Sequence, residues 1–367
     1  MVSLLPVKRV FLAIVLLGCL LQGCKNDLEL NAPYKDIPIV YAVLNPSDSL
    51  QIIRINKAFL GEADANVMAK VADSVNYQPN EIEVKLLHSS GNTPIVFTES
   101  VITTEAGAFS TTQRIYVAVT KVGSATELKT SGIYTLQIKN TRSGAVFTAK
   151  AAPLSAPPVS GYAPFIPPYY PVDKSKYDPY NNGGTVYIDY SKMAQNYPIR
   201  YATNEGKIYN LTLRFHFYEV PEGTKDTAWR SVDLVYNNQT NAANSTLLSV
   251  TAKGSDIMAG LGLALNKLSI EPKGYIRRMY KVQYIVMAST QEYLDYLEYS
   301  KSGFSISSEK PLYSNFDSKA AYGIFTFRNT LTVDKEMAYP YVDVFAEDAN
   351  TCKYWFSKAT SGPTGCK

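Results

Sequence analysis

The sequence predicts a mainly β protein with two β-rich domains, the second of which carries two short helices. The chain contains 28 Tyr and 14 Phe together with many Val, Ile and Thr residues, and these residue types favour strands. Short apolar or alternating segments recur along the chain, and 20 Pro and 21 Gly supply turn residues between them. Both observations are typical of antiparallel β structure.

The first 23 residues have the layout of an export signal. Lys8 and Arg9 precede a mainly apolar stretch from residue 10 to residue 21. This stretch is too short to span a bilayer, but it is typical of the apolar region of a signal peptide. We therefore expect residues 1–23 to direct export and to be removed.

A lipidation signal follows the apolar stretch. In Leu21-Gln22-Gly23-Cys24 a small residue precedes a cysteine, whose thiol can take a diacylglycerol and become an acylated N-terminus. We expect an outer-membrane lipoprotein anchored at Cys24, with a polar tether over residues 24–35. Leu16-Leu17-Gly18-Cys19 has the same form, so Cys19 stays an alternative. Whether the protein faces the periplasm or the cell surface stays open.

The charge of the mature chain is nearly balanced. Loss of residues 1–23 leaves 344 of the 367 residues and removes Lys8 and Arg9, so the formal charge falls from +4 to +2. This balance argues against a nucleic-acid partner. Besides the lipidated Cys24, the mature chain keeps Cys352 and Cys366, and an oxidising envelope would allow these two to form a disulfide.

The first domain is expected over residues 36–157. A strand from Ile37 to Leu44, a turn at Asn45-Pro46 and a strand from Leu50 to Lys57 predict a hairpin. The segment 61–75 favours a short helix or an ordered loop, and further short strands follow up to residue 149. About seven short strands with regular turns are typical of an immunoglobulin-like β-sandwich.

A linker is expected over residues 158–184, because proline at its density there cannot support a strand ladder. Tyrosines alternate with these prolines, and they either pack the linker onto the domains or form a platform for sugar rings or a partner. These candidate ligand-platform residues are Tyr162, Tyr169, Tyr170, Tyr177 and Tyr180.

The second domain is expected over residues 185–367. Its predicted strands include segments 185–190, 207–220, 229–236 and 275–288. Apolar residues at helical spacing predict helices near 255–268 and 290–300. The segments 321–332 and 339–345 are predicted as the last strands.

Three features resemble a family of Bacteroidota outer-membrane lipoproteins whose function is unassigned. They are the lipidation signal, the helix containing Thr290-Gln291-Glu292-Tyr293-Leu294, and Ser314-Asn315-Phe316 ahead of Gly323-Ile324-Phe325. The resemblance implies a β-rich envelope protein, similar to those found alongside TonB-dependent transporters, and it implies no catalytic residues. In the last motif, Gly323 is expected to allow close backbone approach while Ile324 and Phe325 enter the core.

Chemical motifs are scarce in this chain. It has two histidines in different predicted domains and no phosphate-binding or dinucleotide-binding loop, so we expect no cofactor and no metal site. Asp-Ser/Thr-apolar patterns, which Bacteroidota O-glycosylate, mark Ser49, Ser74 and Thr227 as candidate O-glycosylation sites.

These patterns favour a non-catalytic binding or assembly role at the outer membrane, with a glycan or a TonB-dependent transporter as candidate partner. Two alternatives stay open. One is a carboxylate-dependent envelope hydrolase, which would need two facing carboxylates. The other is a purely structural component of a surface complex.

Overall fold

The computed structural model describes residues 37–58, 65–91, 93–105, 111–158, 188–268, 270, 273–301, 312–317 and 320–366. Strands dominate this part of the chain, which confirms the mainly β class; the immunoglobulin-like arrangement stays a prediction. The predicted signal peptide, both candidate lipidation cysteines, the predicted tether and the five tyrosines of the predicted linker lie outside the described residues.

The first half of the chain forms strands with two short helices between the second and the third. Asn45 ends the predicted hairpin's first strand, and its carbonyl and side chain accept hydrogen bonds from the backbone N–H groups of Asp48 and Ser47. The elements are β1 (Pro38–Leu44), β2 (Leu50–Lys57), α2 (Ala65–Met68), α3 (Ala72–Val75), β3 (Ile82–His88), β4 (Ile95–Thr103), β5 (Thr112–Val119), β6 (Tyr134–Asn140) and β7 (Val146–Ala151).

The second half combines longer strands with helices. Its elements are β8 (Asn196–Ala202), β9 (Ile208–Pro221), β10 (Ala228–Thr240), β11 (Leu247–Lys253), α4 (Gly254–Asn266), β12 (Tyr275–Ser289), α5 (Gln291–Lys301), β13 (Tyr322–Glu336), α6 (Tyr339–Glu347) and a 3-10 turn, η1 (Cys352–Tyr354). The helices predicted near 255–268 and 290–300 are therefore confirmed as α4 and α5.

The strand predicted at 339–345 is wrong, because these residues form α6. Tyr and Val favour strands by type, but Tyr341, Val342, Phe345 and Ala346 are buried at helical spacing. Pro340 stands in the first turn, where its missing N–H costs no helical hydrogen bond.

One sheet of eleven strands runs through both halves, in the order β10-β9-β12-β13-β1-β2-β5-β4-β3-β6-β7, and β11 and β8 form a separate pair. The long strand β13 joins the halves. Its residues 322–327 pair in parallel with β1, and its residues 328–336 pair antiparallel with β12. Part of the predicted second domain therefore completes the sheet of the first.

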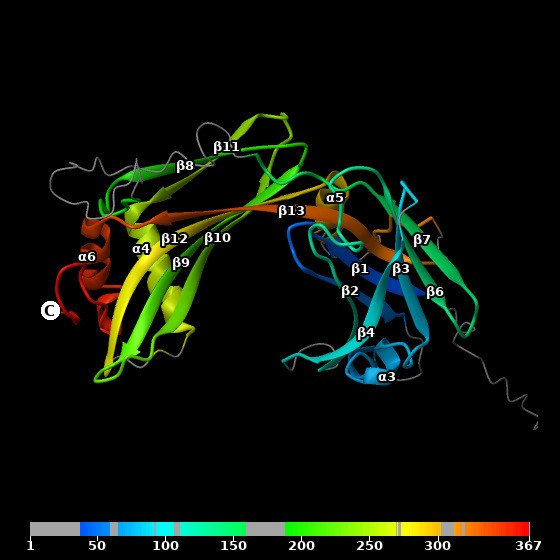
Figure 1. Ribbon diagram of the computed structural model, residues 1–367, viewed down its shortest axis with the longest axis horizontal. Helices are drawn as coiled ribbons and strands as arrows, with labels where there is room; N and C mark the ends of the chain where they lie inside the picture. The colour runs from blue at the N-terminus through cyan, green and yellow to red at the C-terminus, as the bar shows by residue number, and fades with distance from the viewer. Residues whose placement is uncertain are drawn as a thin grey trace, which may run out of the picture.

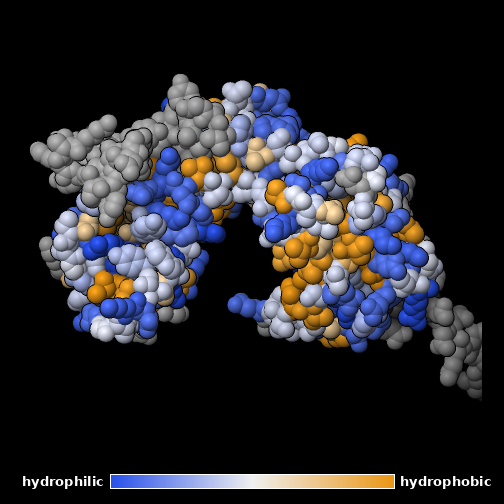
Figure 2. Space-filling model, in the orientation of Figure 1, coloured by the Kyte–Doolittle hydropathy of each residue, from blue (hydrophilic) through white to orange (hydrophobic). Residues whose placement is uncertain are grey.

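Figure 1 shows two lobes joined through β13. We call β1–β7 with residues 312–327 the N-terminal lobe, and β8–β12 with α4, α6 and residues 328–366 the C-terminal lobe. The space-filling view in Figure 2 shows a hollow between them. In the C-terminal lobe, α4 buries Ile257, Leu261 and Leu265 against the sheet, as its predicted spacing requires.

Candidate functional site

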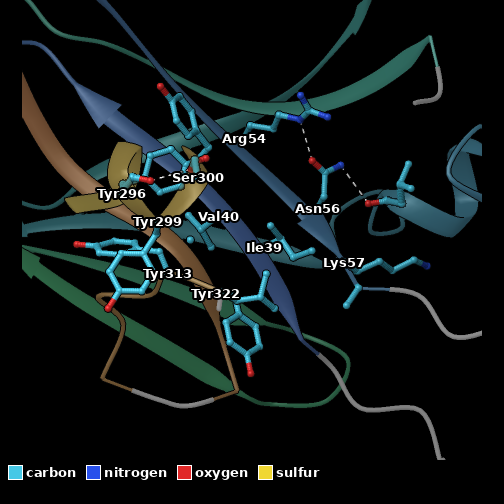
Figure 3. A pocket seen from close by; sticks show the side chains of 15 residues that line it. Ile39, Val40, Arg54, Asn56, Lys57, Tyr296, Tyr299, Ser300, Tyr313 and Tyr322 are labelled. Atoms are coloured by element: carbon cyan, nitrogen blue, oxygen red, sulfur yellow. Dashed lines mark hydrogen bonds between the residues drawn. The ribbon is translucent and has the colours of Figure 1, made fainter. Parts of the chain in front are cut away.

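A pocket of about 780 Å³ opens on the N-terminal lobe beside α5. It is built from β1, β2, α5 and the region around the start of β13 (Figure 3). Its lining residues are Ile39, Val40, Tyr41, Arg54, Asn56, Lys57, Ala58, Val75, Tyr296, Tyr299, Ser300, Leu312, Tyr313, Tyr322 and Gly323. A pocket of this size falls in the range of ligand-binding clefts.

The close approach of β13 to β1 forms the floor of the pocket. Gly323 has φ +112°, and a Cβ atom built on it would lie 1.9 Å from the carbonyl oxygen of Val40, so only glycine fits here. Ile324 and Phe325 are fully buried. The expectations for Gly323, Ile324 and Phe325 are therefore confirmed.

Hydrogen bonds between the segment 312–317 and β13 fix the side of the pocket that contains Tyr313. The side chain of Asn315 donates to the backbone oxygen of Phe325 at 2.6 Å and accepts from its N–H at 2.9 Å. The N–H of Gly323 donates to the carbonyl oxygen of Tyr313 at 2.9 Å. The same segment bridges to Ala149 of β7 through Phe316, so it connects the sheet edge at β7 to β13 and positions Tyr313.

Four tyrosines form a chain of ring contacts along the pocket. Tyr296 contacts Tyr41 and Tyr313 with ring centroids 6.0 and 5.8 Å apart, and Tyr299 contacts Tyr313 at 5.6 Å. Tyr296 and Tyr299 share one face of α5 because they are three residues apart. Figure 3 shows the tyrosines of α5 and Tyr313 grouped on one side of the pocket and Arg54 on the other. Each such pair contributes about 0.5–1.5 kcal/mol beyond area burial.

The electrostatics of the pocket are neutral to positive. Burial, followed by the nearby charges of Asp295 and Glu292, raises the pKa of Tyr313 to about 12. Burial also raises the pKa of Tyr41, so these hydroxyl groups stay protonated at neutral pH. Arg54, which donates to Asn56 at 2.7 Å, and Lys57 add positive charge.

No Asp or Glu occurs among the described lining residues, so the pocket does not offer the facing carboxylates that a glycosidase-type hydrolase would need. Within the described chain, no group of three His, Cys, Asp or Glu residues is arranged to hold a metal ion. The described helices are all too short or too polar to cross a membrane.

The pocket continues into an exposed apolar surface on β1, β2 and β5. Both faces of these strands carry apolar side chains: Val40, Ile53 and Ala118 are buried, while their neighbours point outward. Leu50 and Ile52 are 49% and 47% exposed, and Val119, which pairs with Leu50, is 67% exposed. We call the outward set of Ile39, Tyr41, Leu50, Ile52 and Val119 the apolar face. Figure 2 shows hydrophobic side chains gathered on this lobe, on the side toward the hollow.

The residues singled out in the sequence lie elsewhere. Ser49 is exposed just before β2, Thr227 is exposed just before β10, and Ser74 is half-buried in α3. Cys352 and Cys366 are joined by a disulfide with Cα atoms 4.8 Å apart. The predicted platform tyrosines lie outside the described residues.

The sequence indicates little of the tyrosine pocket. The three-residue spacing of Tyr296 and Tyr299 shows only that both lie on one side of a helix.

Comparisons with known proteins add nothing to the geometry: no protein-family model and no curated protein matches this chain.

Proposed function

We propose that the protein is a lipid-anchored outer-membrane protein with a non-catalytic binding or assembly role, and that it holds a partner polypeptide in the hollow. The observation that carries this proposal is the apolar face, which is continuous with the tyrosine pocket through Ile39 and Tyr41. Contiguous exposed apolar surface of this kind marks interaction sites in soluble domains.

The composition of the surface fits a protein interface. Tyrosine and arginine are enriched at the energetic centres of interfaces, and Tyr41, Tyr299 and Arg54 all line the pocket. Burying a large aliphatic side chain contributes about 1.5–3 kcal/mol. Covering Leu50, Ile52 and Val119 would therefore supply several kcal/mol toward binding.

Two other occupants fit less well. A glycan presents mainly hydroxyl groups and would leave the aliphatic residues of the apolar face uncovered or poorly matched. A planar bilayer fits less well because the largest hydrophobic patch of this view lies on one lobe, beside the hollow (Figure 2). The sequence resemblance makes a TonB-dependent transporter the leading candidate partner, and an acylated Cys24 would keep the protein at the same membrane.

The test compares two lysine substitutions in the full-length, membrane-anchored protein. Ile52→Lys places a charge in the apolar face, and Val146→Lys places one at an exposed position of β7 as the matched control. Envelopes are dissolved in mild detergent, and the size of the complex containing each protein is measured by native electrophoresis. We expect wild type and Val146→Lys to migrate in a complex larger than the free protein and Ile52→Lys to migrate alone. Migration of wild type as the free protein, or an unchanged complex with Ile52→Lys, contradicts the proposal.

A further inference from the structure

Strand β10 forms one edge of the eleven-stranded sheet and pairs only with β9 in the described part of the chain. The register is continuous from Ala228 to Tyr236 and shifts between Tyr236 and Gln239. β10 therefore presents a regularly paired stretch of nine residues at an edge of the sheet. The backbone groups that point away from β9 in such a stretch can template another strand.

Helix α4 packs against β10 and a register shift interrupts its C-terminal end, but two other usual protections of an edge strand are missing. Its sequence, AWRSVDLVYNNQT, contains neither proline nor lysine. Its two charges are engaged with neighbouring strands, since Arg230 pairs with Glu219 at 3.1 Å and Asp233 pairs with Arg214 at 2.8 Å. The opposite edge of the sheet differs, because residues 314–316 bridge β7 to β13.

Exposed apolar side chains accompany this edge. Trp229 is 62% exposed and Val235 is 52% exposed, and their even spacing places both on one side of β10. The ring of Trp229 lies 5.7 Å from that of Tyr218 on β9 and 5.5 Å from that of Tyr280 on β12, so it leans over the face of the sheet toward these two strands. An added strand with apolar side chains on this side would cover Val235 and lie beside Trp229.

The edge also faces the site of the proposed function. Figure 1 shows β12, β9 and β10 following one another toward the hollow, so the edge lies across the hollow from the N-terminal lobe. In Figure 2 the hollow is narrower than either lobe. It therefore suits an extended segment better than a lobe of a second copy of this chain.

We propose that the partner polypeptide docks by strand addition: an extended segment of it pairs with β10 and extends the sheet by one strand. This inference rests on the proposed function, because it concerns the same partner in the same hollow. Main-chain hydrogen bonds to β10 would supply affinity, and apolar side chains beside Trp229 and Val235 would supply specificity.

A photo-crosslinking series along β10 tests this arrangement in cells that carry the full-length protein. A photoreactive residue replaces Trp229, Ser231 or Val235 in turn, Ile52 serves as the reference on the apolar face, and Val146 serves as the negative control. Strand pairing fixes a register, so the crosslinked residue of the partner must shift by two when the probe moves from Trp229 to Ser231. It must shift by four more, in the same direction, when the probe moves to Val235.

The outcomes separate the two proposals. An ordered shift along the polypeptide that Ile52 also captures supports strand addition. A polypeptide adduct from Ile52 with none from the three β10 positions, or with linked residues in no order, overturns strand addition and leaves the proposed function standing. If Ile52 forms adducts only with lipid, or forms none, the proposed function fails and strand addition fails with it.

Discussion

At the scale of single residues, Gly323 determines how closely β13 can approach β1. Its positive φ and the short distance from its would-be Cβ to Val40 both exclude a side chain. The close approach of the two strands at this point of their parallel pairing therefore requires glycine.

We expect Gly323→Ala to lower the free energy of unfolding by more than about 3 kcal/mol, because steric overlap adds to backbone strain. Gly144→Ala is the matched control, since Gly144 also has positive φ, +75°, but a Cβ there meets nothing within 4 Å. The control should cost only about 1–2 kcal/mol. Urea unfolding of both variants measures the difference, and equal losses would show that the contact with Val40 is unimportant.

Glu219 is expected to be the most sensitive carboxylate of the C-terminal lobe. It accepts from Arg277 at 3.0 Å, and the Arg277 side chain is 1% exposed. Glu219→Gln should cost about 3–5 kcal/mol, because it removes a negative charge that lies 3.0 Å from a buried guanidinium. Asp233→Asn breaks a largely exposed pair with Arg214 and should cost less than about 1 kcal/mol. Similar losses in thermal or urea unfolding for both variants would contradict this distinction.

The tyrosines also predict a pH dependence. Burial raises the pKa of Tyr190, Tyr341 and Tyr41 above the ordinary value, and that of Tyr313 to about 12. A raised pKa in the folded state means that the unfolded chain ionises first. This contribution to stability is therefore complete below about pH 10 and is lost as the pH rises through the raised values. Urea midpoints should be level up to about pH 9 and fall above about pH 10; a constant midpoint at higher pH would contradict the burial of these hydroxyls.

At the scale of elements, the C-terminal tail depends on a covalent bond. The disulfide between Cys352 and Cys366 spans a sequence separation of 14 and joins η1 to the end of the chain. On a loop-entropy basis we expect Cys352→Ser to cost about 3 kcal/mol. Cys366→Ser and the double variant should cost the same, because each removes the same bond. Unfolding free energies equal to that of the oxidised wild type would rule out this contribution.

Local patterns predict most of these elements well. The alternation in β1, β2 and β3 and the helical spacing in α4 and α5 each reflect one face packing against a core, which neighbouring residues reveal. The segment 339–345 was predicted as a strand because residue type outweighed spacing. The pairing of β13 with β1 has no local signal, since it joins segments from opposite ends of the chain.

At the scale of the whole molecule, the site was harder to predict than the fold. Tyr41, Tyr299 and Tyr313 come from three separate segments, which the pairing of β13 with β1 brings together. The apolar face could not be predicted from the sequence for another reason. Strands with apolar residues on both faces indicate two buried sides, and sequence alone does not show that one side of β2 is exposed.

The central claim is that a polypeptide covers the apolar face in the native envelope. Its most direct test is the rate at which a membrane-impermeant maleimide labels Ile52→Cys. The rate is measured in opened native envelopes and in liposomes that contain only the purified lipidated protein, and Val146→Cys serves as the control. We predict that Ile52→Cys reacts at least about tenfold more slowly in envelopes than in liposomes, equivalent to 1.4 kcal/mol or more of protection, while Val146→Cys reacts equally in both. Equal rates for Ile52→Cys in the two preparations would contradict the account, and slow labelling in both would assign the cover to lipid instead of a polypeptide.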